Sequence, residues 1–297
     1  MPERSNLFED ANKTIARKSQ EFPLHYYILK EGVEDLALIK QLLAPQDFSR
    51  ALESQISLVN LDYNQIVEFT PLNLAIDYLK TESALWLIEN KAKINTRDSY
   101  GYYPIHFAVQ KNLTSIVKKL IDFGADVNAT TNFNLTPIFF AKSCDMLELL
   151  IKHKANPNAL DNDQRSPLMF YCREGYYKLV YKILENEIDV NGLDNKNSCA
   201  LHYAIISLQT PNEDVNLLEC VRALISKKAN PNIPSQGLSP IEIANMFNRN
   251  EISTFLQNLH SQNSSSSQIS PITRQNQHPR STINSPSSKV SSCCQIS

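Results

Sequence analysis

A six-residue pattern recurs seven times along this chain of 297 residues and constrains its fold more than any other feature. Its copies are FPLHYY (22–27), TPLNLA (70–75), YPIHFA (103–108), TPIFFA (136–141), SPLMFY (166–171), CALHYA (199–204) and SPIEIA (239–244). Three of the six intervals between their first residues equal 33 residues. This spacing is typical of repeat architectures, in which neighbouring units cover one another's apolar faces.

Each unit is predicted to contain two helices followed by an extended hairpin. Thr or Ser before Pro is a helix start, because the hydroxyl accepts hydrogen bonds from free backbone N–H groups and Pro fits the first helical position. This signal is intact at Thr70, Thr136, Ser166 and Ser239. A second helix follows, as in residues 114–124, where apolar residues fall at helical spacing and Gly124 suits a left-handed cap. A second register places an Asn near the end of the units, at Asn95, Asn128, Asn158, Asn191 and Asn232.

These residues resemble the ankyrin repeat, a 33-residue unit with the patterns T-P-L-H-x-A and G-A-D-V-N. The resemblance covers about residues 20–260, and residues 103–129 follow the family pattern most closely. It implies an all-α repeat fold, an α-solenoid with β-hairpin fingers, in which the histidines His25, His106 and His202 tie neighbouring turns together. Four units depart from the pattern at the place of Gly124, which predicts lower local stability; they carry Lys91, Lys154, Glu187 and Lys228.

The array is predicted to span residues 21–260, after an N-terminal cap segment at 1–20 and before a disordered Ser-rich tail at 261–297. Residues 44–65 are interpreted as an insertion with a short extra helix. The fourth unit loses three residues around 141–146, and the sixth gains a segment at 207–216. Insertions in solenoids often serve binding, and neutral drift in a loop is the alternative interpretation.

Charge and motifs exclude several classes of function. The net charge of −2 gives no basis for binding nucleic acid. The N-terminus lacks the apolar core of a secretion signal, and no stretch is apolar and long enough to span a bilayer. No catalytic motif, metal-ligand spacing or phosphate loop is present, so we expect a non-enzymatic protein without cofactor or metal. Four scattered cysteines are expected to be buried apolar residues: Cys144, Cys172, Cys199 and Cys220.

Aromatic residues supply the candidates for binding a protein partner. The fifth place of the pattern is apolar in every unit, at Tyr26, Leu74, Phe107, Phe140, Phe170, Tyr203 and Ile243. Either these residues pack between first helices or they form a binding stripe that includes Phe107 and Phe140. Tyr100, Tyr102 and Phe133 fall in hairpin tips that the fold leaves in water, and Tyr78, late on a first helix, is a further candidate.

The last four residues, Cys294 to Ser297, fit the C-a-a-X pattern that protein prenyltransferases read. A single lipid chain binds membranes only marginally, so Cys293 is a candidate for palmitoylation as the second signal. The segment 261–297 has no Asp or Glu, and it carries Arg274, Arg280 and Lys289. The chain thus resembles ankyrin effectors of intracellular bacteria, whose C-a-a-X boxes are prenylated by host enzymes.

Asn128 resembles the sites that a host asparaginyl hydroxylase modifies in ankyrin repeats, since Asp126 and Val127 precede it and Leu120 stands eight residues before it. The function predicted from sequence is a protein-binding module held by a prenylated Cys294 at the cytoplasmic face of a host membrane. Two alternatives are a scaffold in the cytoplasm without lipid and an enzyme with an unrecognised site.

Overall fold

A computed structural model describes residues 24, 25, 28, 37, 40, 41, 43–60, 65–207 and 214–266. The chain divides into two compact units, Met1–Asn258 and Leu259–Ser297. The repeats belong to the first unit. The predictions for the segment 1–20, for Tyr26, for Cys293 and Cys294, and for the tail beyond residue 266 lie outside the described residues.

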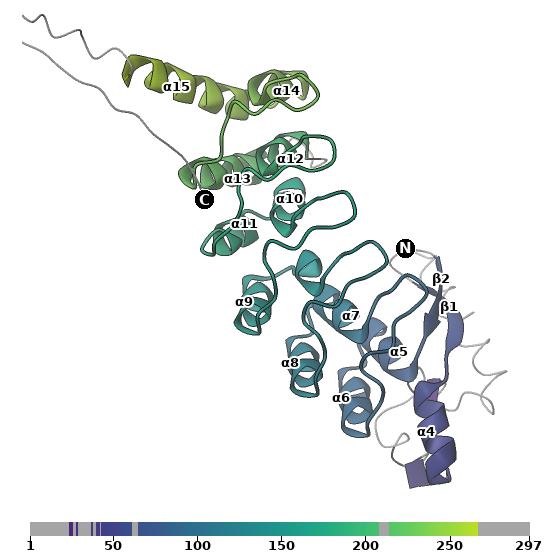
Figure 1. The fold of residues 1–297 in the computed structure, drawn as a ribbon. Helices are drawn as coiled ribbons and strands as arrows, with labels where there is room; N and C mark the ends of the chain where they lie inside the picture. Colours follow the sequence, from purple (N-terminus) through teal and green to yellow (C-terminus); the bar gives the residue numbers. More distant parts are fainter. Residues whose placement is uncertain are drawn as a thin grey trace, which may run out of the picture. The chain divides into compact units, whose positions relative to one another are not determined.

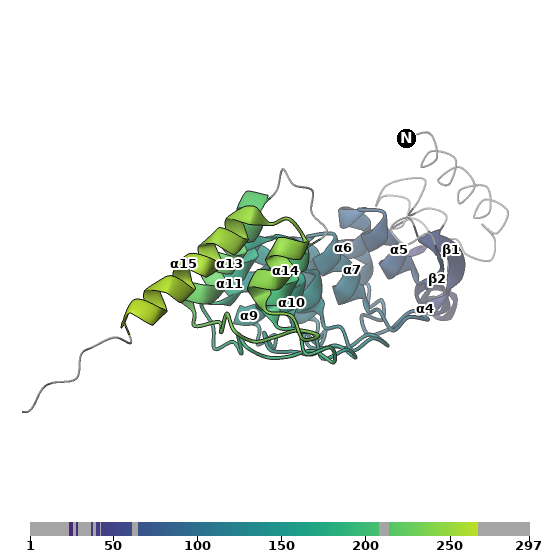
Figure 2. The same cartoon turned by 90° about the horizontal axis from the view of Figure 1, so that it is seen from above.

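The repeats form pairs of helices that follow one another in two rows (Figures 1 and 2). The pairs are α5 (Pro71–Asp77) with α6 (Thr81–Glu89), α7 (Pro104–Gln110) with α8 (Thr114–Asp122), the 3-10 helix η1 (Pro137–Phe140) with α9 (Cys144–Lys152), α10 (Pro167–Arg173) with α11 (Tyr177–Ile183), α12 (Ala200–Ile206) with α13 (Asp214–Ser226), and α14 (Pro240–Met246) with α15 (Asn250–Ser266). First helices contact first helices of the next unit, as α10 contacts α12 and α12 contacts α14. The predicted all-α repeat array is confirmed.

Three of the four first helices with Thr or Ser before Pro begin as their sequences predict. The hydroxyl of Thr70 accepts the Asn73 N–H at 3.2 Å. The hydroxyls of Ser166 and Ser239 accept the N–H of the third helical residue, Met169 and Glu242, at 3.4 and 3.3 Å. Pro occupies an early helical position in each of these three units. Side-chain caps of this kind typically contribute about 1 kcal/mol each.

The fourth unit departs from the prediction, because its first helix is a four-residue 3-10 turn. Its Thr136 is buried and makes no side-chain cap. The loss of three residues explains the change, since Ala141 already has extended backbone angles where other units continue their helix. The short turn cannot fill the space that a full helix would occupy.

Tyr171 of the fifth unit occupies space beside this short turn. It is 1% exposed, and its hydroxyl donates to the carbonyl of Ile138 in η1. The corresponding residue is Ala in most other units, at Ala75, Ala108, Ala141, Ala204 and Ala244. A large side chain therefore stands where the repeat normally requires a small one, beside the unit that lost residues.

The insertion contains more structure than predicted. The expected helix is α4 (Pro45–Glu53), whose Phe48 meets Trp86 edge-on at 6.0 Å between ring centroids. Two strands follow, β1 (Ile56–Asn60) and β2 (Gln65–Phe69), paired antiparallel with Ile56 opposite Phe69. This hairpin was not predicted.

Three lysines adopt the left-handed cap that the repeat assigns to glycine. Gly124 has φ of 93°, and Lys91, Lys154 and Lys228 have φ of 67°, 68° and 67°. A side chain in this conformation costs about 1–2 kcal/mol. Glu187 differs, because α11 already ends at Ile183 and no residue from 184 to 191 has a positive φ.

The histidines tie neighbouring units together, as the resemblance implies. The Nε2–H of His106 donates to the carbonyls of Ala129 and Leu135 at 3.0 and 3.2 Å, while its Nδ1 accepts the Tyr103 N–H at 3.0 Å. His25 and His202 donate in the same way to Phe69 and Ile233, both at 2.9 Å. Both ring nitrogens of His106 are therefore committed in the neutral form. Burial lowers the pKa of His25 and His106 to about 4 and also lowers that of His202.

The finger loops between units are closed turns rather than paired strands. In three of the fingers a buried Asp organises the turn. Its Oδ1 atom accepts hydrogen bonds from two backbone N–H groups of the same finger. These residues are Asp98, Asp161 and Asp194. Apart from β1 and β2, the described residues show one isolated bridge, between Ser235 and Leu238. The loops gather along one edge of the helical rows (Figure 2).

One boundary and one cysteine differ from the predictions. α15 continues past residue 260 to Ser266, into the segment expected to be disordered. Among the cysteines, Cys172, Cys199 and Cys220 are buried as expected, but Cys144 is partly exposed at the start of α9.

Candidate partner-binding surface

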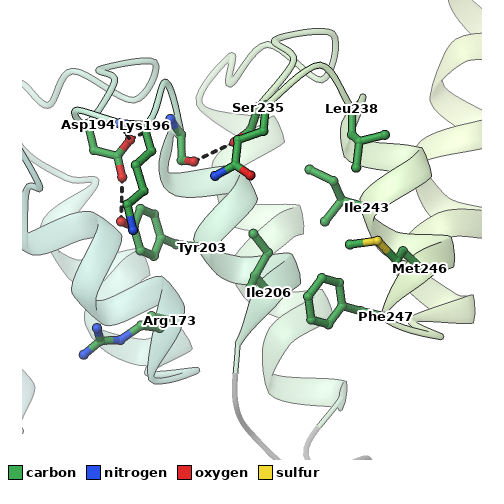
Figure 3. Close-up of a pocket in the computed structure, with 12 residues that line it drawn as sticks. Arg173, Asp194, Lys196, Tyr203, Ile206, Ser235, Leu238, Ile243, Met246 and Phe247 are labelled. Atoms are coloured by element: carbon green, nitrogen blue, oxygen red, sulfur yellow. Dashed lines mark hydrogen bonds between the residues drawn. The ribbon is translucent and has the colours of Figure 1, made fainter.

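A groove of about 420 Å³ lies between the first helices α10, α12 and α14 and the two fingers that precede α12 and α14 (Figure 3). Each of the three helices contributes residues near its C-terminal end, and the two fingers form the remaining wall of the groove. Twelve residues from these five segments line it. Two other hollows of similar size, about 430 and 410 Å³, are lined by α13 with α15 and by the start of α9 with residues 175–179 and Asn216, and neither contains a finger.

Exposed apolar side chains form the floor of the groove. Ile206 is 36% exposed, Leu238 37%, Phe247 41% and Met246 61%. Ile206, Met246 and Phe247 lie in the last turn or at the C-cap of their helices, so their side chains stand at the edge of the packed helices and not between them. A contiguous patch of exposed apolar side chains is typical of an interaction surface.

Polar groups at the opposite side of the groove are held by a fixed network. The Oδ2 atom of Asp194 accepts the Tyr203 hydroxyl at 2.7 Å, while its Oδ1 atom accepts the N–H groups of Lys196 and Ser198. Burial and the bond to Asp194 raise the pKa of Tyr203. The Ser198 and Ser235 hydroxyls, 2.7 Å apart, join the two fingers. The network fixes the walls of the groove, and both oxygens of its carboxylate are bonded within the protein.

The predicted aromatic stripe divides between packing and groove. Leu74, Phe107 and Ile243 are at most 3% exposed, so the packing interpretation holds for them. The Phe107 ring is 2% exposed and packs against the rings of Phe69 and Tyr102, with centroids 6.2 and 5.7 Å away, which favours packing over partner binding for this residue. Phe140, Phe170 and Tyr203 are half-buried. Of the whole stripe, Tyr203 and the buried Ile243 line the groove.

The hairpin candidates separate in the same way. Phe133 is 51% exposed, as predicted for a tip residue. Tyr102 instead packs on Phe107 and Phe140 at 5.7 and 5.6 Å and is half-buried, because its finger folds back against the first helices. Tyr100 is also half-buried, and its carbonyl accepts the Asn132 N–H of the next finger at 3.0 Å.

Tyr78 is half-buried at the C-cap of α5. Burial, with a smaller contribution from Asp77, raises its pKa to about 12. The candidates Tyr78, Tyr100, Tyr102, Phe133 and Phe140 do not line the groove.

Sequence reasoning missed the groove residues one helical turn beyond the stripe. Arg173, Ile206 and Met246 stand three residues after Phe170, Tyr203 and Ile243. Residues three positions apart lie on the same face of a helix, so the sequence could have predicted these residues as a second stripe beside the first. Leu238 and Phe247 had no such signal, because their exposure depends on how the last two units stack.

Asn128 belongs to a ladder that links successive units. Its Nδ2 group donates to the Lys154 carbonyl at 3.0 Å, and its Oδ1 atom accepts the Asn156 N–H at 2.8 Å. Asn158 and Asn191 make the same pair of bonds to the units that follow them. Hydroxylation of Asn128 is untested and stays a prediction; a modifying enzyme would have to break both of its bonds.

We expect Asn128→Ala to lower the free energy of unfolding by about 1–2 kcal/mol, because two hydrogen bonds between units are lost. Urea unfolding followed by circular dichroism measures it. Asn232→Ala is the matched control, since its side chain makes no such pair within the described residues. Equal effects of the two changes would show that the ladder contributes nothing.

The described residues contain no cluster of three or more His, Cys, Asp or Glu arranged to hold a metal ion. Nor does any helix among them have the length and apolarity required to cross a membrane.

Comparison with known proteins gives one family. A sequence profile described as "Ankyrin repeats (3 copies)" matches residues 81–161, 105–194 and 140–235, which together span just over half of the chain. The putative ankyrin repeat protein FPV244 of Fowlpox virus is 32% identical over 167 residues, which are 52% of this chain and 24% of that protein. The neurogenic locus notch homolog protein 2 of Homo sapiens is 28% identical over 137 residues, 45% of this chain and 5% of that protein.

The match therefore spans a quarter or less of the length of these relatives. A crystal structure of an ankyrin repeat domain from Acinetobacter baumannii is similar with a TM-score of 0.55 and 25% identity. It covers 64% of this chain, and the match includes 97% of that domain.

Proposed function

Because the chain belongs to the ankyrin-repeat family, we propose that it is a protein-binding module whose partner occupies the groove between α10, α12 and α14. The exposed apolar floor carries this proposal, above all Met246 at 61% exposure. Folding gains little from leaving Met246 and Phe247 in water, whereas a partner that covers them would remove their apolar surface from it.

The chemistry of the groove supports binding over catalysis. Its carboxylate, Asp194, is 6% exposed and accepts three hydrogen bonds from within the protein, so it is poorly placed to act as a general base on a substrate. Burial raises the pKa of Cys199, and lowers that of the adjacent His202, whose Nε2 is bonded to Ile233. A buried thiol of raised pKa is a poor nucleophile.

Met246→Ser combined with Phe247→Ser should reduce capture of the partner at least tenfold while thermal unfolding changes little, because both side chains are exposed. Affinity purification from eukaryotic cells with quantitative mass spectrometry measures this. Phe123→Ser is the matched control: Phe123 is 47% exposed and, like Phe247, is the C-cap of its helix with φ of −90°. Unchanged partners with the double variant would contradict the groove as the binding site.

We further propose that Phe133 and Tyr100, on neighbouring fingers, extend the partner-binding surface beyond the groove. Support comes from the 51% exposure of Phe133 and from the hydrogen bond between the fingers of residues 100 and 132.

A separate part of the proposed function is attachment to a host membrane, as expected for a bacterial effector. It is supported by the C-a-a-X pattern at Cys294 and by the adjacent Cys293. Cys294→Ser should shift the protein from the membrane to the soluble fraction of eukaryotic cells, because the prenyl acceptor is lost. Cell fractionation with mass spectrometry of the C-terminal peptide measures it. A wild-type peptide without lipid would instead favour a scaffold that acts without an anchor.

A further inference from the structure

The two ends of the groove differ in chemistry (Figure 3). Arg173, Lys196 and Tyr203 lie at one end, and Leu238, Met246 and Phe247 lie at the other. Ile206 lies between them. An occupant must therefore match a polar, cationic surface and an apolar one within the length of a single groove.

The cations at the first end are available to a partner. The Lys196 ammonium forms no ion pair within the described residues, and the side chain is exposed. Arg173 contacts Glu174 at 3.0 Å, but both side chains are more than a third exposed, at 37% and 45%, so the pair is weak. The Arg173 guanidinium also lies 4.8 Å from the centre of the Phe170 ring.

The acid of the groove does not cancel these charges for an incoming group. Asp194 is buried, and both of its oxygens are bonded to the finger and to Tyr203. The surface that a partner meets at this end is thus cationic, with two donors, Arg173 and Lys196, that suit a carboxylate.

On the basis of the proposed function, we infer that the partner inserts a peptide segment with an acidic side chain within a few residues of bulky apolar ones. The carboxylate contacts Arg173 and Lys196, and the apolar side chains cover Met246 and Phe247. Charge complementarity at the rim sets the orientation of the segment, while the apolar floor supplies most of the affinity.

Charge also argues against the chain's own tail as the occupant. Residues 267–297 carry Arg274, Arg280 and Lys289 and have neither Asp nor Glu. A cationic segment meets like charge at this rim, which disfavours it. We therefore assign the groove to a segment of another protein.

A random peptide display library selected on the full-length protein tests the inference. We expect selected peptides to be enriched in Asp or Glu near Leu, Phe or Trp. Fluorescence polarisation of individual labelled peptides should show at least tenfold weaker binding for Met246→Ser with Phe247→Ser. Arg173→Glu with Lys196→Glu should weaken it at least tenfold and reverse its salt dependence, because added salt then screens a repulsion and no longer an attraction. Lys142→Glu with Lys178→Glu is the charge control, because these lysines line a different hollow.

The outcomes separate the two proposals, provided that each variant unfolds thermally like the wild type. Peptides that need Met246 and Phe247 but lack acids, and that bind the Arg173 and Lys196 variant normally, would overturn the acidic segment and keep the groove. Selection of no peptide, or of peptides insensitive to both pairs of changes, would overturn both. Groove-dependent binding of a synthetic peptide of residues 267–297 would assign the groove to the tail and overturn the inference.

Discussion

Tyr171→Ala should lower the free energy of unfolding by about 3–5 kcal/mol, although Ala is the residue that the repeat normally has at this place. The side chain is 1% exposed, and its hydroxyl donates to the Ile138 carbonyl of the shortened fourth unit. Truncation would leave a cavity between the fourth and fifth units and an unbonded buried carbonyl. Chemical unfolding measures the loss, and hydrogen exchange should locate it at η1 and α10.

Two further variants separate packing from hydrogen bonding. Tyr171→Phe keeps the ring and should cost about 1–2 kcal/mol, the usual loss when a buried acceptor is left unbonded. Tyr176→Ala is the surface control, since Tyr176 is 38% exposed in the same unit, and we expect a loss below about 1 kcal/mol. If Tyr171→Ala stabilised the protein, the preference of the repeat for a small residue would outweigh the local packing.

Lowering the pH from 7 to 5 should reduce the free energy of unfolding by about 2 kcal/mol for each of His25 and His106. Burial lowers the pKa of both from 6.5 to about 4. Between pH 6.5 and 4 these histidines are protonated in the unfolded chain but not in the folded one. The free energy of unfolding therefore decreases as the pH falls below 6.5. The contribution of the two histidines to the free energy of unfolding is fully present above pH 6.5. It decreases down to about pH 4, where the histidines of the folded protein are protonated as well.

Urea unfolding at several pH values measures this effect. His106→Gln should be less stable than the wild type at pH 7, yet its stability should fall less steeply between pH 7 and 5, because one titrating group is gone. Unperturbed carboxylates titrate mainly below this window, so the difference in slope reports the histidine. Parallel slopes for the wild type and this variant would mean that His106 does not titrate as a buried neutral group.

Local signals in the sequence predicted the features that depend on a few neighbouring residues. Helix starts at Thr70, Ser166 and Ser239 follow from a hydroxyl followed by proline. The bonds of His25, His106 and His202 between units followed from the resemblance to the family. These features repeat with the unit, so each copy supported the interpretation of the others.

Features that depend on contacts between units could not be predicted in this way. Thr136 and Pro137 carry the same helix start, yet the unit forms a 3-10 turn because three residues are missing downstream. The burial of Phe107 and the exposure of Met246 depend on what the neighbouring units place beside them. The candidate groove was therefore missed, while the stripe that borders it was found.

The pairing of Tyr171 with the shortened fourth unit has an evolutionary consequence. Restoring the three missing residues would bring a full helix into the space that the phenol ring fills, whereas replacing Tyr171 first would open a void. Either change alone is expected to destabilise the protein, whereas the two together are tolerated. This relation is sign epistasis between an insertion and a substitution. Lineages of this protein should consequently keep both features or lose both, even though the two sites are separated by about one repeat of sequence.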